Sequence, residues 1–388
     1  MSTRAPGPGS LAGLRRANRD RVLGALADHG EVNQATLARE TGLSSASVSG
    51  LVRTLVGEGA VVVRDGTANG RRGRLVSLRR TASAGVGIDL GRRHCRVVVG
   101  GADGDVLAEA VAELEDDHLP DDTLPVVDDL VRRCSEAAGV APAELAVAGL
   151  GVPGPVEPSG ERITGGTILR GWTDLPVRET LGAALGVPVF VDNDANMGVV
   201  GVDSVLGSDS GLVFVKVGSG IGAGVAVGGR VVRGVTSMAG EIGHLPVDTR
   251  LPTMCRCGRR GCLETAGSSG AVLASLGAAL GRRVTMPEAL ELVADRDPVA
   301  LAVLEDAGNV LGRALAGLGM ALNPGVVALA GALPELGEPY LEPVRTGFRQ
   351  AVLPAINDAT AVVVSPLGAR TVAVGALVAA LRATAAAA

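Results

Sequence analysis

The apolar residues between positions 19 and 57 recur at the spacing of three successive helices. From Arg19 the first helix carries an apolar face that ends near Gly30, and a second, shorter helix is expected over residues 34–40. Ser44 can cap a third helix, and the buried stripe of that helix is expected to be Val48, Leu51, Val52 and Leu55. A helix, a short helix, a glycine-containing turn and a further helix predict a helix-turn-helix.

Two short strands, over residues 61–64 and 75–78, are predicted next, and the polar sequence DGTANGRRGR separates them as the tip of a wing. Small hydroxyl groups on a helix allow close approach to the major groove of DNA, and arginine binds guanine or phosphate. The expected DNA contacts lie on the outer face of the third helix and on the wing: Ser45, Ser47, Ser49, Arg53, Arg71, Arg72 and Arg74. The simpler alternative is a solvated helix face beside a solvated loop.

The charge of the chain is unevenly distributed. Residues 1–80 contain thirteen arginines and six acidic residues, a balance of +7, whereas the whole chain carries −5. A basic N-terminal segment on an otherwise acidic chain indicates that this segment contacts a polyanion. Together with the winged helix, it predicts binding to double-stranded DNA. Because of this basic balance, a winged helix that binds only protein is the weaker alternative. Aromatic residues make up 1% of the chain, which argues against recognition by base stacking.

Beyond residue 84 the pattern changes to short apolar strands separated by glycine turns. A unit of strand, glycine turn, strand, turn and strand occurs twice, and helices follow each copy. The strands are expected over residues 86–89, 95–99 and 106–111, and again over 212–217, 225–227 and 230–233, with the glycine turn GSGIGAG at 218–224. This duplication predicts an α/β fold with two lobes and a ligand-binding cleft between them.

Polar residues gather where two further strands end. A strand over residues 145–150 leads into the turn GVPGPV, and a strand over 187–191 leads into DNDAN at 192–196. Sheets of α/β proteins bind ligands where a parallel strand meets its helix. The remaining expected elements are helices over 124–138, over 298–322 and from residue 371, and a strand over 326–331.

One short loop, between Gly240 and Glu264, combines a histidine with three cysteines: His244, Cys255, Cys257 and Cys262. One imidazole and three thiolates form the four-coordinate donor set that zinc prefers at a closed structural site, with no position left for a reactive water. The alternative is a group of buried free cysteines. The two other cysteines, Cys95 and Cys134, are expected to be small core residues.

Length and composition limit the class of protein. A chain of 388 residues with 47% hydrophobic residues is long enough for two or three domains with buried cores. Five cysteines, three of them in one loop, do not form a disulfide framework and fit a reducing cytoplasm. The N-terminal residues lack the apolar segment of a secretory signal, and the apolar tail from Thr371 is interrupted by Arg382. We therefore expect a cytoplasmic protein that makes no membrane contact, with a buried helix at its C-terminus.

Five segments together resemble the ROK family of repressors and sugar kinases. They are GVPGPV at 151, DNDAN at 192, VGSGIGAGV at 217, the loop from GEIGH to CLE, and LNPGVVALAG at 322. The resemblance covers essentially the whole chain, including the winged helix that regulators of this family carry and its plain kinases lack. It implies a duplicated actin-like, ribonuclease H-like ATPase fold that binds sugar and carries a structural zinc loop. The implied domains are residues 1–82, residues 83–190 joined by the helix 371–388, and residues 191–370.

The resemblance also implies a sugar site. Its residues would be Gly154, Asn193, Asp194, Glu241, His244 and Glu264. Asp194 would be the catalytic base in a member that phosphorylates its sugar, and a zinc-bound His244 would present its second nitrogen as a fixed donor. Carboxylates accept hydrogen bonds from paired hydroxyl groups, which suits Glu241 and Glu264. The alternative for these two glutamates is capping of helix ends beside the metal loop.

The sequence departs from the family where kinases bind nucleotide. Asp89-Leu90-Gly91 runs into Arg92, Arg93 and His94 in place of the glycines and hydroxyl of a DxGGT-type phosphate loop. The eroded nucleotide set is Asp89, Gly91, Gly218, Gly220, Gly222 and Gly331. A sugar pocket without a complete nucleotide pocket is what a ligand sensor would have.

The resulting hypothesis is a sugar-responsive transcriptional regulator of carbohydrate metabolism genes, with repression as the expected mode. It would bind a double-stranded operator as a homodimer or homotetramer and respond to a small sugar or sugar phosphate. The alternative is a sugar kinase that carries a DNA-binding head, depends on ATP and Mg²⁺, and uses Asp194 as its base.

Overall fold

The computed structural model divides the chain into two compact units, Met1–Ala82 and Ser83–Ala388. Each unit has its own hydrophobic core. The described residues are 18–19, 21–26, 32–57, 61–68, 71–78, 84–101, 104–164, 169–173, 175–207, 211–248 and 253–387.

The first unit is a winged helix-turn-helix, as predicted. After a helical segment over residues 21–26 come β1 (Val32–Asn33), α2 (Gln34–Thr41), α3 (Ser45–Gly57), β2 (Val61–Ala68) and β3 (Arg71–Leu78). The three strands form an antiparallel sheet in the order β1-β3-β2. The predicted end of the first helix, near Gly30, lies outside the described residues.

Local signals in the sequence set the turn between α2 and α3. The Asn33 side chain caps α2 by accepting the backbone N–H of Thr36 at 2.8 Å. Gly42 ends α2 in the left-handed conformation, with φ of 67°. The Ser44 hydroxyl accepts the N–H of Ser47 at 3.2 Å, so Ser44 caps α3 as expected. This places Val48, Val52 and Leu55 in the core of the unit.

The wing is longer than its hydrophobic pattern predicts. The strand pairing runs from Val61 opposite Leu78 to Ala68 opposite Arg71, so eight residues on each side belong to the hairpin. Backbone hydrogen bonds do not depend on apolar side chains, and the polar segment therefore continues the ladder. As a result, Arg71, Arg72 and Arg74 lie on β3 and not in a loop; the side chains of residues 65–73 lie outside the described part of the structure.

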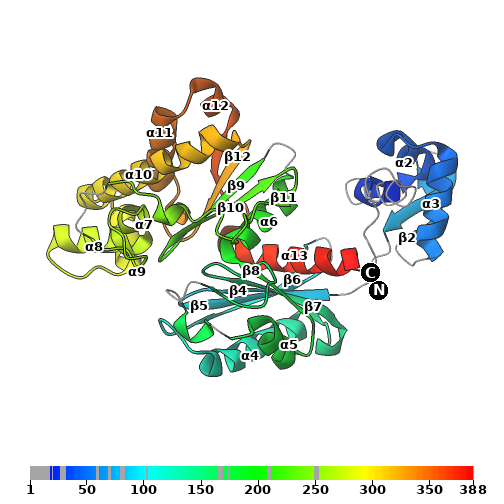
Figure 1. The fold of residues 1–388 in the computed structure, drawn as a ribbon, viewed down its shortest axis with the longest axis horizontal. Coiled ribbons are helices and arrows are strands. Elements are labelled where there is room, and N and C mark those ends of the chain that lie inside the picture. Colours follow the sequence, from blue (N-terminus) through cyan, green and yellow to red (C-terminus); the bar gives the residue numbers. More distant parts are fainter. Residues whose placement is uncertain are drawn as a thin grey trace. The chain divides into compact units, whose positions relative to one another are not determined.

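The second unit contains two five-stranded sheets with the same topology (Figure 1), which confirms the predicted duplication. In each, three antiparallel strands are followed by two parallel ones. The first sheet has the order β6-β5-β4-β7-β8, with β4 Ala84–Leu90, β5 His94–Gly100, β6 Val106–Glu113, β7 Leu145–Val152 and β8 Val189–Asn193. The second has the order β11-β10-β9-β12-β13, with β9 Leu212–Val217, β10 Ile221–Val227, β11 Arg230–Val231, β12 Val326–Ala330 and β13 Ala361–Val364.

Helices cover both faces of these sheets. They are α4 Pro120–Ala138, α5 Val177–Leu185, α6 Asp194–Leu206, α7 Glu264–Gly267, α8 Ser269–Leu280, α9 Met286–Ala294, α10 Pro298–Leu322, α11 Glu338–Ala351, α12 Pro354–Ala359 and α13 Thr371–Ala387. Residues of α4 and α5 share a core with the first sheet. Residues of α8, α10 and α11 share a core with the second sheet. Between the sheets, α13 packs on the first and α6 on the second (Figure 1).

The C-terminal helix α13 is a core helix. An 18-residue window at Gly368–Ala385 is apolar and long enough to cross a membrane, but 56% of it is buried inside the protein. Ala373, Leu377 and Leu381 lie in one cluster with Val98 and Val147 of the first sheet. Burial among strands of its own unit accounts for its composition.

Two of the element boundaries that differ from the sequence expectations lie close to the predicted site. β8 extends to Asn193, so the expected domain division after residue 190 runs through this strand. The glycine turn expected over 218–224 is shorter, because β10 already begins at Ile221. A side chain at Gly224 would collide with the carbonyl oxygen of Ala195 on α6. Glycine at this position therefore allows a strand to pack closely on a helix, which is a tertiary requirement.

Candidate functional site

The end of β8 and the start of α6 place the predicted sugar residues. Asp194 is the first residue of α6, and Asn193 caps this helix by accepting the N–H groups of Ala195 at 2.9 Å and Asn196 at 3.3 Å. The Asn193 amide also donates to the carbonyl oxygen of Gly154 at 3.0 Å. Gly154 has a φ of 99°, which favours glycine. The structure therefore brings Gly154, Asn193 and Asp194 together.

An ionic cluster around the buried Asp192 supports this strand end. Asp192, which sequence reasoning did not select, is 5% exposed and accepts from Arg233 Nε at 2.8 Å. Its other oxygen accepts from the Asn196 amide at 2.9 Å. Arg233 follows β11, so this pair links the second sheet to the last strand of the first.

Lys216 on β9 is the most important residue that sequence reasoning missed. Its Nζ lies 2.9 Å from Asp194 Oδ2 and 3.2 Å from Asp89 Oδ1. Burial raises the pKa of Asp89, but Lys216 and a hydrogen bond from His94 outweigh burial and hold that pKa below its ordinary value. Burial lowers the pKa of Lys216, and the two carboxylates more than compensate and raise it. One signal could have identified Lys216, because it is the only lysine among the 36 basic Lys and Arg residues of the chain.

The nucleotide side of the predicted site is occupied by side chains of the protein. His94 Nε2 lies 3.0 Å from Asp89 Oδ2, and the His94 ring covers Gly91 so closely that a side chain there would collide with it. Arg92 and Arg93 bind Asp116, with Nε of Arg92 at 2.6 Å and Nη2 of Arg93 at 2.8 Å. The residues present do not fit the phosphate-binding role of this loop.

The remaining glycines of the predicted nucleotide site lie close to other parts of the protein. A side chain at Gly331 would collide with the carbonyl oxygen of Val217, and Gly222 lies within β10. Gly218 accepts the N–H of Ser269 at 3.0 Å, which ties the turn to the start of α8. A side chain at Gly220 would lie 2.5 Å from Glu264 Oε2. Glycine at positions 331 and 220 therefore allows the neighbouring backbone and the Glu264 side chain to pack closely.

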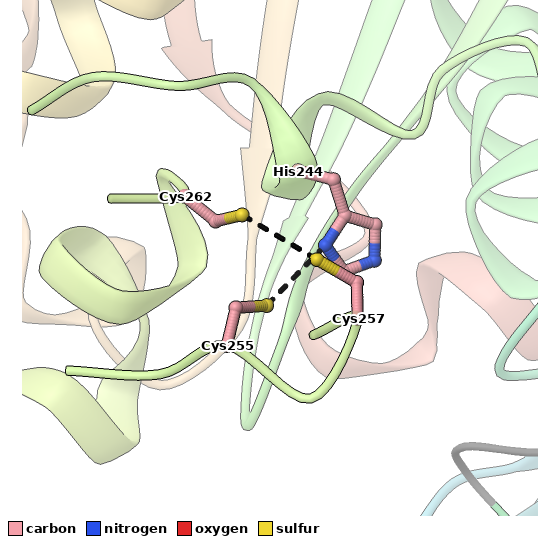
Figure 2. A group of neighbouring side chains, drawn as sticks. All are labelled: His244, Cys255, Cys257 and Cys262. Atoms are coloured by element: carbon pink, nitrogen blue, oxygen red, sulfur yellow. Dashed lines mark hydrogen bonds between the residues drawn. The ribbon is translucent and has the colours of Figure 1, made fainter. Parts of the chain in front are cut away.

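The predicted metal ligands converge. The ligand atoms of His244, Cys255, Cys257 and Cys262 all lie within 4.8 Å of one another (Figure 2). The sulfur atoms of Cys257 and Cys262 are 3.6 Å apart. Two thiolates on one tetrahedral zinc, with bonds of ~2.3 Å, would lie about 3.8 Å apart. Burial and the neighbouring thiols together raise the pKa of the Cys262 thiol to about 12. A bound cation would act in the opposite direction and stabilise the thiolate. The donor set and its spacing fit a zinc ion.

His244 connects the metal loop to the predicted sugar residues. Its Nδ1 lies 3.5 Å from Cys255 Sγ, while its Nε2 lies 3.9 Å from Glu241 Oε2. Burial raises the pKa of Glu241, and repulsion from Asp194 and Glu264 raises it further. Arg256 Nε donates to Glu264 Oε1 at 2.9 Å. Glu241 makes no side-chain cap of the short helix that follows it, Ile242–His244, which disfavours the capping alternative.

The predicted DNA contacts on α3 are accessible. Ser45, Ser47 and Arg53 are exposed and Ser49 is half-buried. The Ser47 hydroxyl lies 2.9 Å from that of Ser44, so it takes part in the cap of α3. Arg74 on the wing is exposed; the side chains of Arg71 and Arg72 lie outside the described part of the structure. The other cysteines, Cys95 and Cys134, are buried in the first lobe, as expected.

The fold and the site now define the class of protein. Residues 85–383 match the sequence model of the ROK family, and residues 19–72 match that of the MarR family. The chain belongs to the ROK family, and it is a transcriptional regulator of that family with a DNA-binding helix-turn-helix.

A repressor matches almost the whole chain, whereas a glucokinase matches a shorter part of it. The xylose repressor of Bacillus subtilis (strain 168) is 26% identical over 367 residues, which cover 93% of this chain and 94% of the repressor. The glucokinase of Halalkalibacterium halodurans is 31% identical over 237 residues, which cover 57% of this chain and 71% of the kinase. A solved ROK family transcriptional regulator, described as a homologue of the E. coli MLC protein, has a TM-score of 0.77 at 21% identity and covers 94% of this chain and 95% of its own. That last likeness shows the shared fold.

Proposed function

We propose that this protein is a sugar-responsive repressor that binds an operator through its winged helix and releases it when a sugar binds the second unit. One observation carries the proposal. A DNA-binding unit shares the chain with two neighbouring carboxylates, Asp194 and Glu241, and Lys216 and His94 pair with Asp89 of the expected nucleotide loop. The whole-chain similarity to a xylose repressor supports it and makes xylose the first effector to test.

The sugar would be held by hydrogen bonds to its hydroxyl groups. The candidate contacts are Gly154, Asn193, Asp194, Glu241, His244 and Glu264. Carboxylates accept from neighbouring hydroxyls, and such charge-assisted bonds are the stronger ones. Burial raises the pKa of Glu241, and Asp194 and Glu264 are close enough to raise it further, which supports one shared pocket.

Zinc would be the structural metal of this pocket. His244 directs Nδ1 to the three cysteines and Nε2 toward Glu241. A metal bound at Nδ1 would fix Nε2 as an N–H donor for Glu241 or a sugar hydroxyl. In this proposal zinc orients His244 and closes the loop between Leu245 and Cys262, while the side chains of the protein bind the sugar.

Regulation requires that sugar binds one conformation better than the other. A coupling of about 1–3 kcal/mol, or about 5- to 150-fold in operator affinity, is typical of such switches. A homodimer would recognise a near-palindromic operator, with half-sites separated by one helical turn or a multiple of it.

Sugar binding is tested most simply by thermal melting of the full-length protein against a panel that begins with xylose. The effector should raise the unfolding midpoint, because a ligand that binds only the folded state adds about 2.7 kcal/mol at a concentration of 100 Kd. ATP with Mg²⁺ should add nothing. If no sugar shifts the midpoint, the sensor role fails. A strong further rise with ATP would favour the kinase alternative, in which Asp194 is the base.

A further inference from the structure

Lys216 stands out in both composition and position. It is the only lysine of a chain whose 35 other Lys and Arg positions are arginine. It lies in the otherwise apolar strand LVFVKV, and its side chain is 20% exposed. An arginine would present a planar fork of donors, whereas lysine presents a compact point charge. The position therefore carries a compact cation.

The surroundings of Lys216 are those of a bound cation. Its ammonium lies between two carboxylates from different parts of the unit, Asp89 at the end of β4 and Asp194 at the start of α6. The Asp89 side chain is 2% exposed and that of Asp194 is 12% exposed. Two buried carboxylates that share one centre form an oxygen donor set of the kind hard divalent cations prefer.

We propose that Lys216 is the resident cation of this site: it holds the place of a divalent metal ion between Asp89 and Asp194, and it thereby restricts the effector to an unphosphorylated sugar that binds without metal or nucleotide. The restriction to sugar rests on the proposed function, whereas the role of the lysine as a resident cation does not.

In this arrangement Asp194 can still accept a hydrogen bond from a sugar hydroxyl. Its Oδ2 accepts from Lys216 at 2.9 Å, and its Oδ1 accepts from the Ala195 N–H at 2.8 Å. Each carboxylate oxygen has two lone pairs, so each retains one for a further donor. These free lone pairs can each accept a hydrogen bond from a sugar hydroxyl.

A phosphorylated sugar would be repelled. Within the described residues, the cations in contact with the predicted sugar-site carboxylates are Lys216 and Arg256, and each is already paired, Lys216 with Asp194 and Arg256 with Glu264. A phosphate dianion would add two further negative charges to this pocket.

The first test is manganese binding by zinc-loaded, full-length Lys216→Ala, measured from the electron paramagnetic resonance signal of free Mn²⁺. Removal of the ammonium leaves Asp89 and Asp194 facing one another, so the variant should bind Mn²⁺ at least ten times more tightly than the wild type. Lys216→Arg keeps the positive charge, so its affinity for Mn²⁺ should equal that of the wild type. Adding Asp89→Asn to Lys216→Ala should return the affinity for Mn²⁺ to the wild-type level. A folded Lys216→Ala that binds no more Mn²⁺ than the wild type would overturn the proposal.

The second test uses the wild type and so does not depend on the folding of a variant. Calorimetric titration with the effector sugar and with its phosphate ester should show the ester at least tenfold weaker. Mn²⁺ at 1 mM should leave the dissociation constant of the sugar unchanged. Tighter binding of the ester, or a requirement for Mn²⁺, contradicts the proposal. If no sugar binds, the proposed function fails, and the manganese test still decides the role of Lys216.

Discussion

Replacement of Asp194 by asparagine is expected to give a repressor that binds its operator but no longer responds to sugar. The change keeps the shape of the side chain but removes the negative charge of the group that accepts hydrogen bonds from sugar hydroxyls. A hydrogen bond to a charged group contributes about 1.5–3 kcal/mol, so the dissociation constant of the sugar should rise about 10- to 150-fold. Helix α3, which carries the predicted DNA contacts, belongs to the other compact unit, and operator binding without sugar should be unchanged.

Calorimetric titration of the sugar measures this effect, and a matched control lies on the same helix. Asp203 of α6 binds Arg382 at 3.3 Å, away from the predicted sugar residues. Asp203→Asn should keep the wild-type affinity for sugar. If Asp194→Asn binds sugar as the wild type does, Asp194 is not a sugar contact.

Loss of one cysteine from the metal loop should have the largest effect on stability. In Cys262→Ser the zinc content should fall from about one ion per chain to near zero. Leu263 and Ile242 flank the loop and are buried in the core of the second lobe, so a loosened loop exposes apolar surface. Metal binding free energy contributes to folding free energy, and a loss of ~3 kcal/mol would lower the unfolding midpoint of a unit of this size by about 5 °C.

Metal analysis and calorimetry of the same samples measure both effects. Cys134→Ser is the control, because it changes another buried cysteine, in the core of the first lobe. It should lose stability through packing while its zinc content stays at that of the wild type. Full zinc occupancy in Cys262→Ser would show that this thiol is not a ligand.

Much of the architecture could be predicted because it follows from patterns of residues that are close in sequence. The spacing of Val48, Val52 and Leu55 identifies the recognition helix, and the repeated strand units identify the duplicated lobes. The cluster of His244 with three cysteines was visible because a short loop limits how far its side chains can separate. These features depend on residues that are close in sequence.

Two of the three features that were missed depend on contacts between distant segments. Lys216 and Asp89 are 127 positions apart, and no local pattern marks them as partners. Gly224 looks like part of a turn, but it lies in a strand because Ala195 of α6 packs against it. The wing extends to Arg71 because backbone pairing tolerates polar side chains. Tertiary packing decided the first two positions, and backbone pairing within the hairpin decided the third.

The central claim is that sugar binding at Asp194 controls DNA binding by the winged helix. The most direct measurement is the affinity of the zinc-loaded, full-length protein for a duplex selected from a randomised pool, by fluorescence anisotropy with and without the effector at fixed salt. We expect saturating sugar to weaken binding about 5- to 150-fold in the wild type and not in Asp194→Asn. Arg53→Ala should bind the duplex poorly in either condition. Equal affinity of the wild type with and without a sugar that demonstrably binds would contradict the account.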